Sequence, residues 1–162
     1  MKRLIWPLLL LSHLLLAALG FALGIYTLPI LTAPASPAPL AMMRSATQAR
    51  YVARMERDLQ DSDWLHWAEG TLRLADDFIA FDGAIAPGPD YKLYLSPQFV
   101  ETEADFLRLK SSMVKVGDVR TFDRFILPLP EQIELARFNS VIIWCESFGQ
   151  FISAARYRPA TD

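Results

Sequence analysis

The most informative segment of this sequence is Ser140-Val-Ile-Ile-Trp-Cys-Glu-Ser-Phe-Gly149. Successive side chains of a β-strand point to opposite faces, so the odd-numbered residues from Val141 to Cys145 share one face and the even-numbered residues share the other. Both faces are apolar, which is typical of a strand that is covered on both sides and central in its sheet. Gly149 favours a turn shortly after the strand.

Further short strands are predicted on both sides of this stretch. Several of these segments alternate apolar with polar residues, and Gly, Pro, Asp and Asn separate them. The expected strands are 69–74, 78–81, 91–96, 114–116, 121–127, 141–145 and 151–157. Two helices are expected among them, at Glu101 to Ser111 and at Glu131 to Phe138. The fold class predicted is mainly β, a β-sandwich-like antiparallel domain.

An apolar segment opens the chain. Leu4 to Leu31 contains no charged residue, and it is longer than the roughly 20 residues that span a bilayer as a helix. We expect residues 1–31 to form a signal anchor whose spanning part lies between Pro7 and Pro29 and contacts lipid through residues 4–31. Lys2 and Arg3 favour a cytoplasmic N-terminus, which places the rest of the chain outside the cytoplasm. A signal peptide cleaved near Ala33-Pro34-Ala35 is the alternative.

The predicted domain order follows from the composition. Residues 32–61 combine a proline-rich spacer, Thr32 to Pro39, with an amphipathic juxtamembrane helix, Leu40 to Gln60, on which apolar residues recur four apart. Residues 62–158 form the β domain, and 159–162 form a tail.

Composition also excludes several functions. The chain of 162 residues has a net charge of -2, so it lacks the excess of basic residues that a nucleic-acid-binding protein needs. Its single cysteine cannot close an intramolecular disulfide, and too few Cys and His residues are present for a structural zinc site. Four aspartates near predicted strand ends match no calcium loop and suit turns instead: Asp76, Asp77, Asp82 and Asp90. No metal site is expected.

Cys145 is the residue with the clearest chemical potential, and two interpretations of it stay open. A thiol packed among apolar side chains has a raised pKa and is inert. An unpaired thiol outside the cytoplasm, however, is a candidate redox group. Its neighbour Glu146 would disfavour a thiolate, so the local charge does not favour a nucleophile.

Cofactor binding has two further candidate residues, His66 and Met113. His66 is the only histidine after the apolar segment, and with Cys145 or Met113 it would supply the axial ligands of a haem. The chain carries neither a Cys-x-x-Cys-His attachment motif nor a Gly-x-Ser-x-Gly elbow, so haem is a weak expectation and enzymatic activity is not predicted.

Several motifs in order resemble the DM-thirteen domain, an extracytoplasmic module that also occurs as a membrane-tethered single domain in bacteria. They are Gly70-Thr-Leu-Arg-Leu74, Asp77-Phe-Ile-Ala-Phe-Asp-Gly83, Gly88-Pro-Asp-Tyr-Lys-Leu-Tyr-Leu-Ser96, Leu127-Pro-Leu-Pro130 and Val141-Ile-Ile-Trp-Cys145. The resemblance covers Trp64 to Tyr157. It implies a β-rich domain with an electron-transfer role resting on a cysteine, which falls here at Cys145.

The sequence therefore supports two functions. The first is a membrane-tethered, extracytoplasmic accessory domain that transfers electrons through Cys145, in exchange with an envelope protein whose identity the sequence does not reveal. The second is a non-catalytic protein- or ligand-binding module of the cell envelope, favoured by the many aromatic residues.

Overall fold

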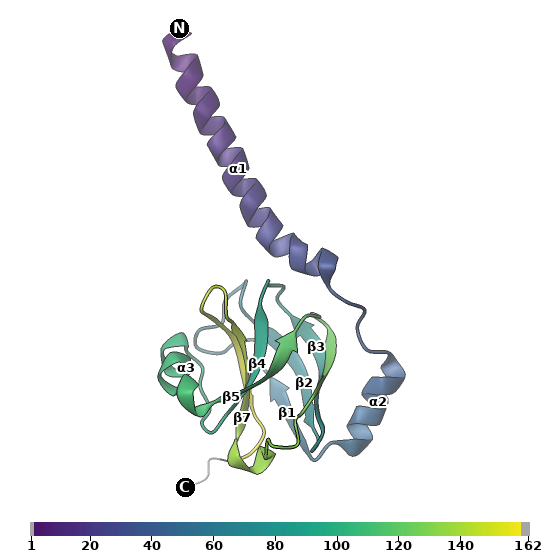
Figure 1. Ribbon diagram of the computed structural model, residues 1–162. Helices are drawn as coiled ribbons and strands as arrows, with labels where there is room; N and C mark the ends of the chain where they lie inside the picture. Colours follow the sequence, from purple (N-terminus) through teal and green to yellow (C-terminus); the bar gives the residue numbers. More distant parts are fainter. Residues whose placement is uncertain (1, 160–162) are drawn as a thin grey trace.

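Two four-stranded antiparallel sheets, packed face to face, form the body of the protein in the computed structural model, which describes residues 2–159 (Figure 1). The strands are β1 (Tyr51–Met55), β2 (Ala68–Leu74), β3 (Phe78–Ile85), β4 (Tyr91–Ser96), β5 (Val114–Val119), β6 (Arg124–Pro128), β7 (Ser140–Cys145) and β8 (Gln150–Arg156). The helices are α1 (Lys2–Thr32), α2 (Pro39–Gln48) and α3 (Glu103–Leu109), with 3-10 turns at Lys110–Ser112 and Leu135–Arg137. The predicted β-sandwich-like class is confirmed.

Strand order explains the composition of the Ser140–Cys145 segment. One sheet has the order β1-β2-β3-β6 and the other β5-β4-β7-β8, so β7 lies between two neighbours, as its sequence predicts. All six of its residues are buried. Contacts of β1 with β8 and of β5 with β6 join the edges of the two sheets.

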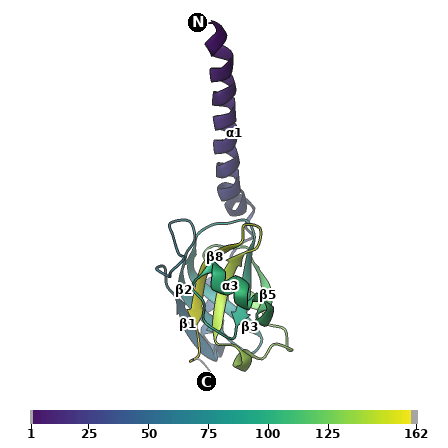
Figure 2. The same ribbon diagram turned by 90° about the vertical axis from the view of Figure 1, so that its left-hand side faces the viewer.

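Each face of β7 belongs to a different apolar cluster. The odd-numbered side chains Val141 and Ile143 enter the core between the two sheets, which also holds the stacked rings of Phe81 and Phe125. Trp144 points the other way and stacks on Phe106 of α3, with ring centroids 3.9 Å apart. Helix α3 therefore covers the outer face of this sheet (Figure 2), and the strand needs apolar residues on both sides.

The strand limits differ in part from those expected. The predicted strands at 78–81 and 114–116 continue to Ile85 and Val119, whereas the strand predicted at 121–127 begins at Arg124. The helix expected at Glu101 to Ser111 is present as α3 and the 3-10 turn that follows it. The Thr102 hydroxyl caps this helix by accepting a hydrogen bond from the Asp105 N–H at 3.1 Å.

The amphipathic helix predicted at Leu40 to Gln60 is wrong over its second half. Helix α2 ends at Gln48, and Tyr51–Met55 forms the edge strand β1, which pairs with β2, so the sheet begins before residue 62. Ala53 and Met55 are buried in the core while Val52 and Arg54 are exposed. In this segment, suitable apolar residues recur both four apart, as in a helix, and two apart, as in a strand. The pairing with β2 decides in favour of the strand.

The helix predicted at Glu131 to Phe138 is also wrong. This segment holds a turn and the three-residue 3-10 helix Leu135–Arg137. Ile133, Leu135 and Phe138 all pack on the core between the sheets. Residues two apart do not share a face of an α-helix, so an α-helical turn here would remove one of these side chains from the core.

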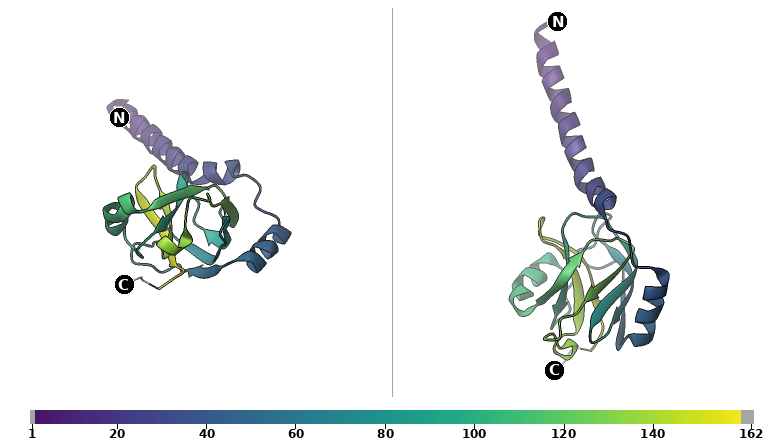
Figure 3. Two further views of the ribbon diagram at one scale, coloured as in Figure 1. Left: turned by 60° about the horizontal axis from the view of Figure 1, so that its bottom comes forward. Right: turned by 45° about the vertical axis from the view of Figure 1, so that its right-hand side comes forward.

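Helix α1 extends away from the β domain (Figures 1 and 2). It includes Pro7 and Pro29, so the helix itself continues past both prolines, which were predicted as limits of the membrane-spanning part. Its segment Ile5–Thr32 is long and apolar enough to cross a membrane. A linker then runs along the side of the domain to α2 (Figure 3). The predicted tail, 159–162, lies outside the described residues except for its first position.

Gly70 and Gly83 face each other on β2 and β3, and we expect Gly83→Ala to destabilise the domain. A Cβ at position 83 would lie 2.2 Å from the Glu69 carbonyl oxygen and 2.5 Å from the Gly70 Cα, so the strands must move apart. The expected loss is about 1–3 kcal/mol of unfolding free energy, measured by urea unfolding in detergent with tryptophan fluorescence.

Gly117→Ala on β5 is the matched control, because a Cβ there meets only Leu127 at 3.7 Å. Its unfolding free energy should stay within about 0.5 kcal/mol of the wild-type value. Equal effects of the two substitutions would contradict the close approach of β2 and β3.

Candidate functional site

Cys145 lies in a row of three residues that crosses one sheet at the end of its strands. Tyr91, at the start of β4, pairs with Cys145, at the end of β7, and Cys145 pairs with Gln150, at the start of β8. Gly149 completes the turn between β7 and β8 with φ +64°, in the left-handed region that favours glycine. The chain reversal places Cys145 at the end of the sandwich that faces α1.

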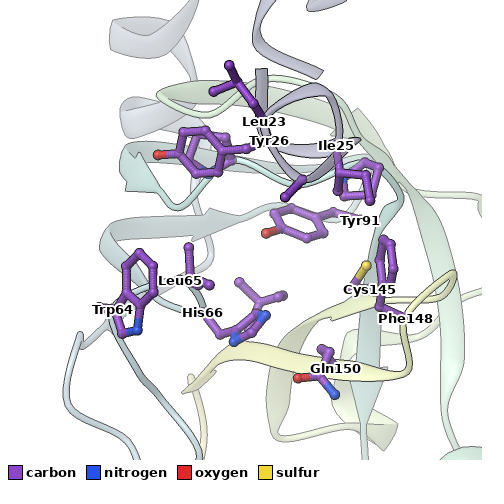
Figure 4. Close-up of a pocket in the computed structure, with 15 residues that line it drawn as sticks. Leu23, Ile25, Tyr26, Trp64, Leu65, His66, Tyr91, Cys145, Phe148 and Gln150 are labelled. Carbon is purple, nitrogen blue, oxygen red and sulfur yellow. The ribbon is translucent and has the colours of Figure 1, made fainter. Parts of the chain in front are cut away.

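A cavity of about 660 Å³ lies between this end of the sandwich and the last turns of α1 (Figure 4). Ile25 and Tyr26 of α1 form one wall, and Trp64 to His66, from the loop before β2, form a second. The Pro87–Pro89 turn and Phe148 complete it with the row of Tyr91, Cys145 and Gln150. The surface is predominantly apolar and aromatic, as in many small-molecule sites.

The Cys145 side chain is buried but borders this cavity. The residue is 3% exposed, and its sulfur lies beside Phe148 in Figure 4. Burial raises the pKa of the Cys145 thiol, and the Asp90 carboxylate acts in the same direction, while backbone groups of Phe148, Asp90 and Ser147 act against them. The thiol is therefore protonated at neutral pH.

Glu146, which the sequence suggests as the acidic neighbour of the thiol, lies on the opposite face of the sheet. Its carboxylate accepts a hydrogen bond from the Tyr94 hydroxyl and an ion-paired hydrogen bond from Lys110 Nζ at 2.7 Å. Asp90 is instead the acidic residue that acts on Cys145, although its own carboxylate is 2.7 Å from Lys92 Nζ.

The two cofactor candidates are separated by the fold. His66 borders the same cavity as Cys145, and its Nδ1 lies 3.0 Å from the Asp63 carboxylate. Met113 belongs to the cluster beneath α3, on the other face of the sheet. The structure therefore brings His66 and Cys145 to one cavity and does not bring Met113 to it, so His66 and Met113 are not arranged as an axial haem pair.

Metal-binding groups are few in this region. Within residues 2–159 no set of three or more His, Cys, Asp or Glu side chains is arranged to hold a metal ion. Of the four aspartates near strand ends, Asp76 pairs with Arg50 at 3.0 Å and Asp90 with Lys92, so these two carboxylates do not converge on a common point.

Tyr91 is a site residue that sequence reasoning missed. It is 3% exposed, and its hydroxyl points into the cavity in Figure 4. Burial raises its pKa, with a smaller effect of Cys145, and no hydrogen bond contributes among the described residues. A Cβ at Gly88 would lie 2.3 Å from this hydroxyl, so the turn holds the ring in place. The alternation of 91–96 places Tyr91 on a strand but does not reveal that Cys145 is its partner.

This geometry defines a class: a β-sandwich domain attached to an apolar helix, with a single buried thiol at the helix-proximal end. Comparison with protein families matches residues 59–157 to the family described as Electron transfer DM13. The match spans more than half of the chain, and the protein belongs to the DM13 electron-transfer family, as the sequence motifs indicate. Neither the curated proteins nor the solved structures contain a match to this chain.

We expect alkylation of Cys145 to need a higher pH in the folded protein than in the unfolded chain. A raised pKa means that the thiolate, the reactive form, accumulates only as pH rises beyond the range of an unfolded cysteine. Iodoacetamide rates between about pH 7 and pH 11, followed by mass spectrometry, measure the midpoint, and the same chain in urea is the reference. A folded midpoint at or below the unfolded one would contradict the inferred environment.

Proposed function

We propose that this protein is a membrane-tethered electron-transfer domain in which Cys145 is the redox group. The observation that carries the proposal is the position of Cys145 at the edge of the core between the sheets, where the residue also borders a cavity. Membership of an electron-transfer family supports a redox role, and Cys145 is the one cysteine in the sequence.

The chemistry that a single thiol supports is thiol–disulfide exchange with a partner protein. The Cys145 thiolate attacks one sulfur of a partner's disulfide, a new S–S bond forms between the proteins, and the second partner sulfur leaves as a thiolate. A thiolate of a second protein, a dithiol donor, then attacks the Cys145 sulfur and releases the first partner with two thiols. The other thiol of the donor closes the donor's own disulfide and frees Cys145, and each leaving thiolate takes up the proton that the attacking thiol gave up. Two electrons thus pass from the donor's dithiol to the partner's disulfide.

The environment of Cys145 suits a protected redox group. A protonated, buried thiol reacts slowly with dissolved oxidants, because the thiolate is the reactive form. Access through an apolar cavity favours a reactant that docks on the aromatic rim, where Trp64 is 80% exposed and Phe148 is 54% exposed. Burial of the Cys145 thiol therefore restricts which molecules can react with it, but it does not prevent the reaction.

The same rim supports the alternative, a non-catalytic binding module. Exposed aromatic side chains at an apolar cavity are typical of surfaces that bind a partner or ligand. In that case the rim is required and the sulfur of Cys145 is not, so a serine at position 145 separates the two functions.

We also propose that α1 anchors the domain to a bilayer through residues 4–31 with the N-terminus in the cytoplasm. Its apolar side chains are exposed, from Ile5 to Leu31, and contact no other element for most of their length. Burying them in lipid removes this apolar area from water. Lys2 and Arg3 support the cytoplasmic placement of the N-terminus.

Cys145→Ser is expected to abolish a mixed disulfide with an envelope protein. Cells are treated with N-ethylmaleimide to trap thiols, and the protein is analysed by non-reducing electrophoresis. The wild-type chain should give a reducible adduct that the variant lacks. Met113→Leu, a conservative change in the cluster beneath α3, is the control and should retain the adduct. A C145S chain that supports full cellular function would favour the binding module instead.

The proposed orientation of the chain in the membrane is tested with variants that carry one new cysteine in the Cys145→Ser background. Val52→Cys lies on the exposed face of β1 and should react with a membrane-impermeant maleimide on intact cells with a permeable outer layer. Lys2→Cys should react only after the membrane is disrupted. Labelling of position 2 before disruption would reverse the proposed orientation.

A further inference from the structure

The cavity beside Cys145 has the features of a ligand site, independently of the thiol. Its volume, about 660 Å³, falls in the range of small-molecule pockets, roughly 300–1,000 Å³. Aromatic rings of Tyr26, Trp64, Tyr91 and Phe148 approach it from four separate segments of the chain (Figure 4). Such a space between a helix and a sandwich, lined by flat apolar side chains, suits a flat apolar molecule.

A few polar groups interrupt this apolar surface. Tyr91 is 3% exposed, its hydroxyl points into the cavity, and no hydrogen bond from this hydroxyl to residues 2–159 is present. The hydroxyl is therefore free to donate a hydrogen bond to an acceptor atom of a ligand. His66 also borders the cavity. The Asp63 carboxylate can only accept a hydrogen bond, so Nδ1 donates to it, and Nε2 of the neutral imidazole is an acceptor.

The position of the cavity indicates the origin of its ligand. Ala22 to Tyr26 belong to the apolar segment Ile5–Thr32 and also form a wall of the cavity. The apolar segment is longer than the roughly 20 residues that cross a hydrocarbon core, so, if α1 spans a bilayer as proposed, Ala22 to Tyr26 lie in the outer part of the segment, near the lipid surface. A lipid-soluble molecule then reaches the cavity without crossing water. A long apolar tail then stays along α1 while the ring occupies the cavity.

We propose that this cavity binds the ring of an isoprenoid quinone. A quinone has a flat ring for the aromatic walls, a carbonyl oxygen that accepts a hydrogen bond from the Tyr91 hydroxyl, and an apolar tail for the bilayer. In the reduced quinol, a ring hydroxyl would donate a hydrogen bond to His66 Nε2. A quinone is also a carrier of two electrons and two protons, which fits an electron-transfer family, whereas an acyl chain has neither the ring nor the redox capacity. The choice of a quinone rests on the proposed function. The shape and polarity of the cavity are observed independently of that function.

The test uses the full chain in phosphatidylcholine nanodiscs and a decyl-benzoquinone that carries a photoreactive azide. Irradiation followed by peptide mass spectrometry should place the label near residues 62–67 and 145–152, and excess unlabelled decyl-ubiquinone should compete. Tyr91→Phe keeps the ring and removes the hydroxyl, so we expect the concentration needed for half-maximal labelling to rise about tenfold.

Ala22→Trp is the blocking variant, because a large side chain on this wall fills the cavity without altering the sandwich core. Ala17→Trp makes the same change farther from the domain on α1, at a position that does not border the cavity, and is the matched control. Labelling should fall at least about tenfold in the first variant and stay unchanged in the second.

Three results would overturn the quinone site: labelling spread evenly along α1, labelling that oleate displaces but decyl-ubiquinone does not, or equal labelling of both tryptophan variants. Each of these leaves the proposed function standing if Cys145 still forms its mixed disulfide. Conversely, site-specific labelling of a wild-type chain that forms no mixed disulfide in cells would support the quinone site and contradict the thiol mechanism.

Discussion

Coverage of β7 on both faces is the constraint on which the rest of the structure depends. One face packs into the core between the sheets, and the other is held by the stack of Trp144 on Phe106 of α3. This double burial fixes β7 between β4 and β8, and a one-residue change of register would exchange the two faces. The end of β7, and with it Cys145, is therefore held at a defined place beside Tyr91 and Gln150.

The same burial shapes the chemistry of the site. The thiol at the end of this covered strand has a raised pKa, and it borders the cavity beneath α1. In the proposed function, reaction at Cys145 is therefore governed by access and by the reactant that enters, and less by the nucleophilicity of an exposed thiolate. Helix α1 contributes a wall of this cavity, so the proposed anchoring and the formation of the cavity involve the same segment.

The sequence predicted the elements whose apolar pattern fits only one kind of secondary structure. It failed where the pattern fits both a helix and another structure. The period-two strands, the central place of 141–145 and the helix after Thr102 are present in the structure. Tyr51 to Met55 fits both a helical and a strand period, and only its pairing with β2 settles it. The segment around Leu135 contains good helix formers, but three of its side chains must reach the core together. Of the site, Cys145 and His66 were identified, and Tyr91 and Gln150 were not.

The amino-acid sequence alone was enough for the long apolar segment, the β class, the family and the identity of the single thiol, because composition, motifs and local periodicity are properties of consecutive residues. Only the tertiary structure decided that the thiol borders a cavity, that His66 shares this cavity while Met113 does not, and that Glu146 faces away. These facts depend on strand order and register, which join residues such as Tyr91 and Cys145 across more than fifty positions of chain, and no local pattern encodes that distance.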